Sequence, residues 1–295
     1  MKVSLITACY NSAATLRMAM ESAVRQKGVD VEYIVVDGGS KDGTVEIIKE
    51  FADRVLNSQT PTSSFTFKWL SERDRGMYDA INKGIKMATG DIVGILNADD
   101  VLESQDTLAH IVDCFNAEGQ RRRGAERDCN RADHAGRVDV VYADIRFVKY
   151  GDSVEALRNA PTVRYCSAKH WRPWMFRFAA MVPHPSFYVR RECFDRLGGY
   201  SLDYRICADF ELELRYLYLA KLKAAYLPEC VVVMRTGGAS TAGWRSNVEI
   251  NREDLRALRA NGVWSSLPLI YLKYLFKIWG FVFRGKSCRR HSAGR

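Results

Sequence analysis

Two hydrophobic periodicities alternate along the first hundred residues, and this alternation limits the possible fold more than any other feature. Apolar, β-branched runs at 3–10, 31–40, 65–72 and 91–100 are typical of buried strands. The segments between them have helical spacing. In the first of these segments, Leu16, Met20 and Val24 recur every four residues. Strands that alternate with helices over short links form parallel sheets with right-handed crossovers, so the sequence predicts an open α/β sheet.

Four notable side chains lie where these predicted strands end: Tyr10, Asp37, Glu72 and Asp99. In open parallel sheets, ligands bind beyond the carboxyl ends of the strands. The carboxyl ends of parallel strands meet at one edge, so we expect these side chains to lie close together. The sequence therefore predicts a binding site at that edge.

The composition is that of a folded protein that can bury a substantial core, with 47% hydrophobic and 27% charged residues in a chain of 295. Its net charge of +9 is unevenly distributed, because Lys and Arg concentrate at 120–137 and again after residue 252. Such local basic segments favour contact with phosphates or an anionic membrane surface. Basic and aromatic residues do not alternate along a strand, so nucleic acid is not a predicted partner.

The eight cysteines are scattered, and the absence of a C-x-x-C pair argues against a zinc site and against a disulfide framework. We expect most of them to be small buried residues in a reducing cytosol. The apolar run at the N-terminus is too short for a signal peptide, and no run in the sequence reaches the roughly 20 apolar residues of a membrane-spanning helix.

The second half of the chain contains a predicted interruption and a return to strand and helix patterns. Segment 116–137 has almost no apolar residues and is predicted to be a flexible basic insertion. The sheet is predicted to resume at 138–148, with a helix at 209–222 and a late strand at 224–235.

The last apolar segment begins at Trp264 and is interrupted by Lys273 and Lys277. Together with Arg284, these lysines lie within about 40° of one another on a helical wheel, opposite Leu, Ile, Phe and Trp side chains. One interpretation is a helix that lies in a membrane interface, with Trp264 and Trp279 near its ends. The other is a helix packed on the domain with its lysines facing water.

Several long motifs resemble those of family 2 glycosyltransferases with the GT-A fold. These are "ITACYN", "VVDGGSKDGT" and "SERDRGMYDAINKGIKMATGDIVGILNADD", and the resemblance continues in "HPSFYVRRECFDRLGGY" and "DYRICADFELELR". It covers roughly residues 1–240, which are predicted to form the GT-A domain, an open, mostly parallel, twisted sheet flanked by helices. Residues 241–295 are predicted to be an amphipathic helical extension. The resemblance implies transfer of a sugar from a nucleotide-sugar donor to an acceptor hydroxyl.

The resemblance also implies roles for individual residues, matched motif by motif. Asp100 would be the ligand of a divalent Mn²⁺ or Mg²⁺ ion, and Asp209 would be the catalytic base. His184, Arg235 and Ser240 match positions near the acceptor or the diphosphate. The implied donor-binding residues are Thr7, Tyr10, Asp37, Arg75, Asp79, Asn82 and Asp99.

Chemistry supports these roles, although simpler interpretations remain open. Asp37 can accept hydrogen bonds from a base edge or ribose, or it can shape the turn that follows it. The adjacent carboxylates of Asp99 and Asp100 repel each other. A divalent cation that binds both these acids and the diphosphate would neutralise that repulsion. Alternatively, Asp100 caps the next helix. For His184, the alternative is a buried imidazole with a satisfied hydrogen bond.

Asp209 lies at or near a predicted helix start, where a carboxylate is stabilised as the anion that a base requires. Glu211 and Glu213 are expected to face solvent or to pair with Arg215. The aromatic stretch "KHWRPWMFRFAAM" is expected to help select the acceptor.

The sequence therefore predicts a cytoplasmic, metal-dependent, inverting glycosyltransferase, peripheral on the inner face of the cell membrane. Its acceptor is expected to be a lipid-linked or oligosaccharide chain of a bacterial surface polysaccharide. One rival is a sugar-phosphate nucleotidyltransferase, although "TACYNSAAT" lacks the basic Gly-rich loop of that class. The other is a non-catalytic membrane-associated scaffold of the same fold.

Overall fold

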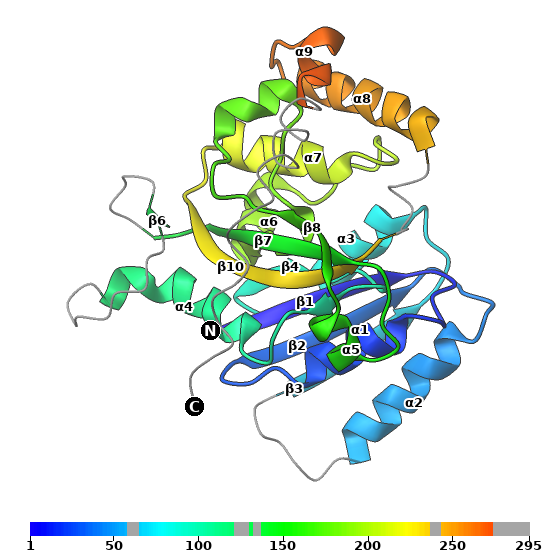
Figure 1. Ribbon diagram of the computed structural model, residues 1–295. Coiled ribbons are helices and arrows are strands. Elements are labelled where there is room, and N and C mark those ends of the chain that lie inside the picture. The colour runs from blue at the N-terminus through cyan, green and yellow to red at the C-terminus, as the bar shows by residue number, and fades with distance from the viewer. Residues whose placement is uncertain (58–64, 121–129, 132–136, 237–242, 274–295) are drawn as a thin grey trace.

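The computed structural model describes residues 1–57, 65–120, 130–131, 137–236 and 243–273, and one twisted sheet forms its centre (Figure 1). The strands are β1 (Lys2–Cys9), β2 (Asp30–Asp37), β3 (Phe65–Ser71), β4 (Ile92–Ile95), β5 (Val101–Leu102), β6 (Asn130–Arg131), β7 (Val140–Val148), β8 (Thr162–Cys166), β9 (Tyr188–Arg190) and β10 (Ala224–Arg235). Their order across the sheet is β3-β2-β1-β4-β9-β7-β10-β5, with β6 paired to β10 and β8 paired to β7.

Helices cover both faces of this sheet. The α-helices are α1 (Leu16–Val24), α2 (Thr44–Asn57), α3 (Met77–Met87), α4 (Thr107–Gln120), α5 (Val154–Asn159), α6 (Arg191–Leu197), α7 (Ala208–Glu213), α8 (Gly243–Ala260) and α9 (Leu267–Tyr271). Short 3-10 helices are η1 (Pro173–Phe178) and η2 (His184–Ser186), and η3 (Leu214–Leu219) is a π-helix that continues α7.

The alternation of side chains along each strand separates two hydrophobic cores. Ile6 of β1 and Ile34 of β2 point to the face that is covered by α3, α6 and α7. Their neighbours Leu5 and Tyr33 point to the opposite face, against α1, α2 and α4. Both faces are covered, which explains why β2 is buried continuously from Val31 to Asp37 rather than at alternate residues.

The predicted α/β architecture is confirmed, and the strand directions show where its parallel part lies. The four strands β3, β2, β1 and β4 are parallel, as are β7 and β10. Between these groups, β9 runs antiparallel to both β4 and β7. The sheet is therefore mixed, and the run predicted from the first hundred residues is its parallel part. Most of the predicted insertion at 116–137 lies outside the described residues.

The chain after β10 packs on the face that carries α7. Helices α8 and α9 join the core of this face through Leu255, Leu258 and Ile270. None of the described helices is long and apolar enough to cross a bilayer.

Lys273 follows α9, and it differs from both interpretations of the last segment. Its side chain is buried and its Nζ donates to Oδ2 of Asp254 in α8 at 2.8 Å. It therefore faces neither a membrane nor water. Lys277, Trp279 and Arg284 of the predicted basic stripe lie outside the described residues.

Candidate active site

The loops that follow β1 and β2 hold each other at the carboxyl edge of the sheet. Asn11 has a left-handed φ of 50°, and its side-chain oxygen accepts the N–H of Lys41 at 3.0 Å. The N–H of Asn11 donates in turn to Oγ of Ser40 at 2.7 Å. Tyr10 stands at the tip of the first loop with 61% of its surface exposed, accessible to a ligand at this edge.

Asp37 ends β2 and organises the turn beyond it. Its Oδ2 accepts the N–H groups of Gly39 and Ser40, each at 3.1 Å, and the hydroxyl of Ser71 at 2.7 Å. Its Oδ1 accepts the Ser40 hydroxyl, and the side chain is buried. Gly39 takes a φ of 84°, which other residues adopt only with strain. These contacts support the turn-shaping interpretation, while contact between Asp37 and a nucleoside stays a prediction.

Asp99 and Asp100 lie on the same edge, just after β4. Asp100 is fully buried, and its Oδ2 accepts a hydrogen bond from Nδ2 of Asn97 at 2.8 Å. Its Oδ1 is also buried and has no side-chain hydrogen-bond partner among the residues that the structure describes. Strand β5 starts at Val101 and the next helix only at Thr107, so the interpretation of Asp100 as a helix cap is wrong.

The electrostatics of Asp100 fit a cation-binding role. Burial raises the pKa of its carboxyl well above the ordinary value, and the charge of Asp99 raises it further, against the smaller opposing effects of Asn97 and Arg235. A buried carboxylate oxygen without a partner, next to a second and partly exposed acid, is suited to a divalent ion. No group of three or more His, Cys, Asp or Glu side chains within the described residues is gathered for a metal. A divalent metal such as Mg²⁺ is often held by only two protein carboxylates, and substrate phosphates then complete its coordination.

Arg235 reaches the same place from the end of β10. The antiparallel pairing of Val233 with Val101 brings the end of β10 next to the residues before β5. The backbone N–H of Arg235, and then its positive charge, lower the pKa of Asp100. The Nε–H of Arg235 is buried and has no partner among the described residues. Its Nη2 lies 3.1 Å from Sδ of Met18. Ser240, the other predicted contact of the diphosphate, lies outside the described residues.

Arg75 and Asp79 form the start of α3 at this edge. Oδ2 of Asp79 accepts the N–H of Arg75 at 3.0 Å, and Oδ1 lies 3.3 Å from the guanidinium. These contacts with Arg75 lower the pKa of Asp79. The Arg75 side chain remains 74% exposed, so its remaining donors are available to an anion.

Two of the predicted donor-binding residues make hydrogen bonds within the protein. Thr7 is fully buried, donates to the carbonyl of Leu96 at 2.7 Å and bonds the Tyr33 hydroxyl at 2.8 Å, while its contact with the donor stays a prediction. Asn82 holds the backbone of Tyr200, donating to its carbonyl at 2.8 Å and accepting its N–H at 2.9 Å. Asn82 therefore fastens the chain that precedes Asp209.

Asp209 lies in the first turn of α7 and is only partly buried. Its Oδ1 accepts the N–H of Phe210 at 2.8 Å and lies 3.2 Å from the hydroxyl of Tyr78. That hydroxyl donates to the carbonyl of Ile206 at 2.5 Å. Tyr78 belongs to the start of α3, beside Arg75, so the carboxylate of Asp209 is tied to the carboxyl edge of the sheet.

His184 and Tyr200 are buried residues close enough to Asp209 to interact with its charge. Nε2 of His184 is 2.7 Å from the Tyr200 hydroxyl, and the Tyr200 ring stacks on Tyr78 with 5.5 Å between ring centroids. Burial lowers the pKa of His184, while the charge of Asp209 raises it. His184 is therefore a buried imidazole with a hydrogen-bond partner, as its simpler interpretation proposed. Sequence reasoning missed Tyr78 and Tyr200, although both lie within motifs that carry the resemblance.

The two glutamates that follow Asp209 differ in role. Glu211 pairs with Arg215, whose Nε is 2.7 Å from its Oε1, as predicted. Glu213 was expected to face solvent or to pair with Arg215, but it is fully buried. Its Oε2 accepts the N–H of Val182 at 3.2 Å, and its Oε1 has no partner in the described parts of the chain. Burial and the charge of Asp209 raise its pKa well above the ordinary value.

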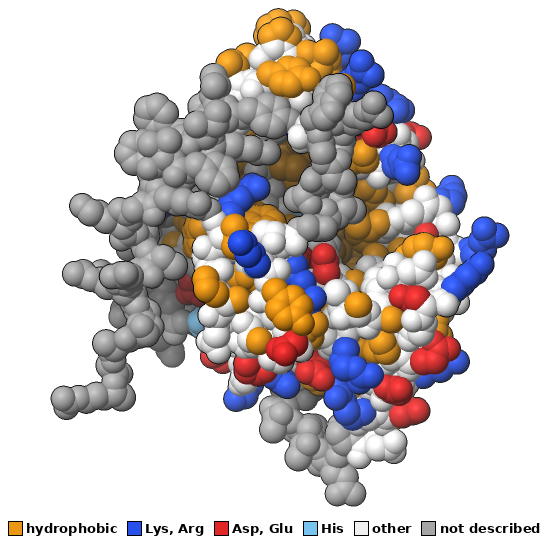
Figure 2. Space-filling view, turned by 45° about the vertical axis from the view of Figure 1, so that its right-hand side comes forward, with side chains coloured by type: hydrophobic (Ala, Val, Ile, Leu, Met, Phe, Trp, Pro, Cys, Tyr) orange, Lys and Arg blue, Asp and Glu red, His pale blue; other side chains and the backbone are white. Residues whose placement is uncertain are grey.

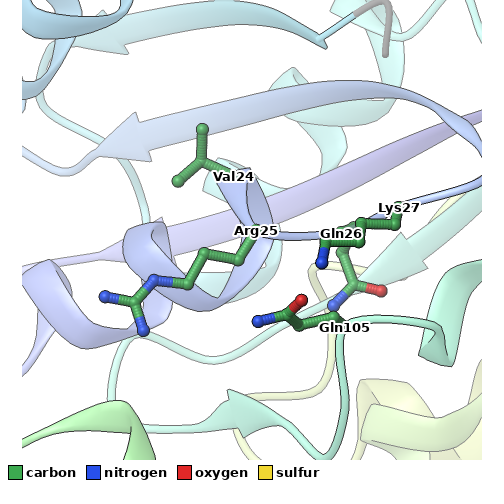
Figure 3. Close-up of a pocket in the computed structure, with 5 residues that line it drawn as sticks. All are labelled: Val24, Arg25, Gln26, Lys27 and Gln105. Atoms are coloured by element: carbon green, nitrogen blue, oxygen red, sulfur yellow. The ribbon is translucent and has the colours of Figure 1, made fainter. Parts of the chain in front are cut away.

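Two cavities differ in their relation to this site. One of about 390 Å³ lies past the end of α1 and is lined by Val24, Arg25, Gln26, Lys27 and Gln105, as Figure 3 shows. None of the predicted site residues lines it. Another, of about 500 Å³, lies between α3 and α6 and includes Arg75, Asp79 and Asn82 in its lining.

Adjacent acids at the carboxyl edge of a parallel sheet suit a metal and the diphosphate of a nucleotide, which indicates an enzyme that acts on nucleotide sugars. The model of the family described as "Glycosyl transferase family 2" matches residues 4–164, and the chain belongs to this family. It is therefore a glycosyltransferase. A PGL/p-HBAD biosynthesis glycosyltransferase of Mycobacterium tuberculosis is 28% identical over 86% of this chain and 83% of its own. An uncharacterised glycosyltransferase of the same species is 30% identical over 72% of this chain and 68% of its own.

Solved structures with the GT-A architecture share the fold. Residues 1–349 of TarS from S. aureus superpose with a TM-score of 0.61 at 15% identity, over 97% of this chain and 76% of that one. The same protein was solved with UDP-GlcNAc. The mannosyltransferase PcManGT from Pyrobaculum calidifontis, in complex with GDP-Man and Mn²⁺, superposes with a TM-score of 0.53 at 20% identity, over 95% and 80% of the chains.

Proposed function

We propose that the protein is a metal-dependent, inverting glycosyltransferase that moves a sugar from a nucleotide-sugar donor to an acceptor hydroxyl. The observation that carries this proposal is the buried carboxylate of Asp100 next to Asp99, with an Oδ1 that no side chain of the described residues binds. The two acids would hold Mn²⁺ or Mg²⁺, which when bound neutralises the charge that develops on the departing diphosphate. PcManGT, which shares the fold, was solved in complex with Mn²⁺, and this supports a divalent ion here.

The protein's own residues supply binding and proton transfer. Arg75 and Arg235 approach the edge with unused guanidinium donors and would bind the diphosphate. Tyr10 and the turn built by Asp37 would receive the nucleoside.

Asp209 removes the proton of the acceptor hydroxyl, and that oxygen attacks the anomeric carbon of the donor. The bond between this carbon and the diphosphate oxygen breaks with its electron pair staying on the oxygen, so one displacement inverts the configuration.

A panel of sugar nucleotides, scored for released nucleoside diphosphate with Mn²⁺ or with EDTA, tests this function. UDP-GlcNAc and GDP-Man belong in the panel because related folds were solved with them. Asp209→Asn is expected to lower kcat by about 10²- to 10⁴-fold, the usual contribution of a general base. Asp100→Asn is expected to abolish the response to Mn²⁺.

Exposed acids serve as matched controls, with Asp203→Asn for the base and Asp106→Asn for the metal ligand. Donor turnover that is equal in EDTA and Mn²⁺, or that survives Asp209→Asn, would contradict the mechanism. Release of pyrophosphate from a nucleoside triphosphate and a sugar phosphate would support the nucleotidyltransferase instead. Absence of any turnover would favour a non-catalytic scaffold.

We further propose that the acceptor belongs to a bacterial surface polysaccharide or is linked to lipid, and that the protein works in the cytoplasm against the inner face of the membrane. Four of its exposed large apolar side chains, Trp174, Trp264, Tyr271 and Leu272, lie on η1, on α9 or directly beside α9. The two parts are joined because the hydroxyl of Ser265 donates to the carbonyl of Arg177 in η1 at 2.6 Å. Figure 2 shows hydrophobic side chains at the top of the molecule with Lys and Arg side chains beside them.

Trp and Tyr side chains next to cations match the interface of an anionic bilayer. Sedimentation with vesicles that contain anionic lipid is expected to capture the protein, and Trp174→Ala with Trp264→Ala is expected to release it. Trp69→Ala is the control, because this exposed Trp lies on β3. Equal binding of both variants would exclude this face as the contact.

A further inference from the structure

A side chain from beyond the sheet holds the backbone that leads into Asp209. Glu253 of α8 accepts three consecutive backbone N–H groups with its carboxylate. Its Oε1 accepts from Arg205 at 3.2 Å, and its Oε2 accepts from Ile206 at 2.9 Å and from Cys207 at 3.0 Å. Hydrogen bonds from N–H groups to a carboxylate are about twice as strong as those between neutral groups.

These N–H groups belong to the turn directly before α7, so their position sets where Asp209 points. The other side of this turn is held from α3, because the Tyr78 hydroxyl donates to the carbonyl of Ile206 at 2.5 Å. The Arg256 guanidinium of α8 also lies over the ring of Tyr204, 5.1 Å from its centroid. The turn is therefore clamped between α3 of the sheet domain and α8 of the C-terminal extension.

We propose that Glu253 is a positioning residue for catalysis, which fixes the carboxylate of Asp209 in reach of the acceptor hydroxyl. This inference rests on the proposed role of Asp209 as the base. Within the described part of the chain, the Glu253 carboxylate bonds the backbone of residues 205–207 and not the side chain of Asp209, so it acts through this turn. Reactions that depend on orientation can lose about 100-fold in rate from a displacement of 1 Å.

Glu253→Gln is the test. The Gln side chain has the shape of Glu, but its NH₂ group is a donor and cannot accept the backbone N–H groups that the second carboxylate oxygen accepts. Glu249→Gln is the matched control, since Glu249 lies one turn earlier on α8 and is exposed. The assay is release of nucleoside diphosphate from the active sugar nucleotide with Mn²⁺, with water as the acceptor. We expect Glu253→Gln to lower kcat by about 10- to 100-fold at an unchanged donor KM, and Glu249→Gln to match the wild type.

A double variant separates positioning from a general loss of structure. If Glu253 acts through Asp209, adding Glu253→Gln to Asp209→Asn lowers the residual kcat by less than about 2-fold, because the group that was positioned is already gone. A full additional 10-fold loss, or a wild-type kcat in Glu253→Gln, overturns the inference. If Glu253→Gln does not fold, Glu253→Asp replaces it, and a kcat equal to that of the wild type then overturns the inference.

The outcomes also distinguish this inference from the proposed function. Activity that survives Asp209→Asn removes the proposed function and the inference together. Activity lost in Asp209→Asn but intact in Glu253→Gln removes the inference alone.

Discussion

Gly199→Ala tests whether Asn82 fastens the chain in front of Asp209. A Cβ atom on Gly199 would lie 2.3 Å from Oδ1 of Asn82, closer than these atoms can approach, and 3.2 Å from its Cγ, a tight contact. The Asn82 amide cannot move aside without giving up its two hydrogen bonds to the Tyr200 backbone, at 2.8 and 2.9 Å. Each such bond contributes about 0.5–1.5 kcal/mol, so we expect the free energy of unfolding to fall by about 2 kcal/mol.

Urea denaturation of four proteins measures this effect: the wild type, Gly199→Ala, Asn82→Ala and the double variant. In Asn82→Ala the obstructing oxygen is absent, so adding Gly199→Ala is expected to cost less than about 0.5 kcal/mol. The two single changes are then coupled by about 2 kcal/mol. If the losses in free energy of unfolding were additive, or if Gly199→Ala alone lost less than about 0.5 kcal/mol, Asn82 would not be held as described. Its amide would then be available to bind the donor.

Three further changes test buried groups. Burial raises the pKa of Glu32, but hydrogen bonds from Lys68 and other donors outweigh it and leave the pKa well below the ordinary 4.5, so its stabilisation is present above that pH and lost as the pH falls. Glu32→Gln is therefore expected to lower the free energy of unfolding by about 3 kcal/mol at pH 7 and by a smaller amount near pH 3, measured by urea denaturation; equal losses at both pH values would contradict this. Burial keeps the pKa of His184 below the ordinary 6.5, so the folded protein loses stability as the pH falls below that value. His184→Gln is expected to flatten the decrease of the melting temperature between pH 6.5 and 5, and parallel curves would refute the effect. Gly94→Ala would place a Cβ atom 2.2 Å from Cε1 of Tyr188 inside the sheet, and calorimetry is expected to show a loss of about 1–3 kcal/mol, whereas an unchanged melting temperature would mean that Tyr188 moves freely.

The sequence predicted the elements whose periodicity is local. The late strand at 224–235 is found as β10 over those same residues, and the parallel strands that open the chain are present. The edge of the sheet on which the strand-end residues lie was also predicted, because the carboxyl ends of parallel strands lie on the same edge.

What could not be predicted depends on partners that are distant in the sequence. Glu213 reads as a helix surface residue, but α7 changes into the π-helix η3 directly after it, and the segment around Val182 covers it. Lys273 reads as part of a basic stripe, but the partner that buries it, Asp254, lies on another helix. A helix cap was the competing interpretation of Asp100 because a strand of only two residues, β5, has no detectable periodicity.

The contact between Glu253 and residues 205–207 has a consequence for how this enzyme can be recombined with its relatives. The boundary predicted at residue 240 separates the motif-bearing part of the chain from its extension, yet the backbone before Asp209 is held from the far side of that boundary. A hybrid spliced at residue 240 would bring a foreign helix to this turn. We therefore expect such a hybrid to keep its donor KM but to lose kcat unless α8 is transferred together with residues 1–240.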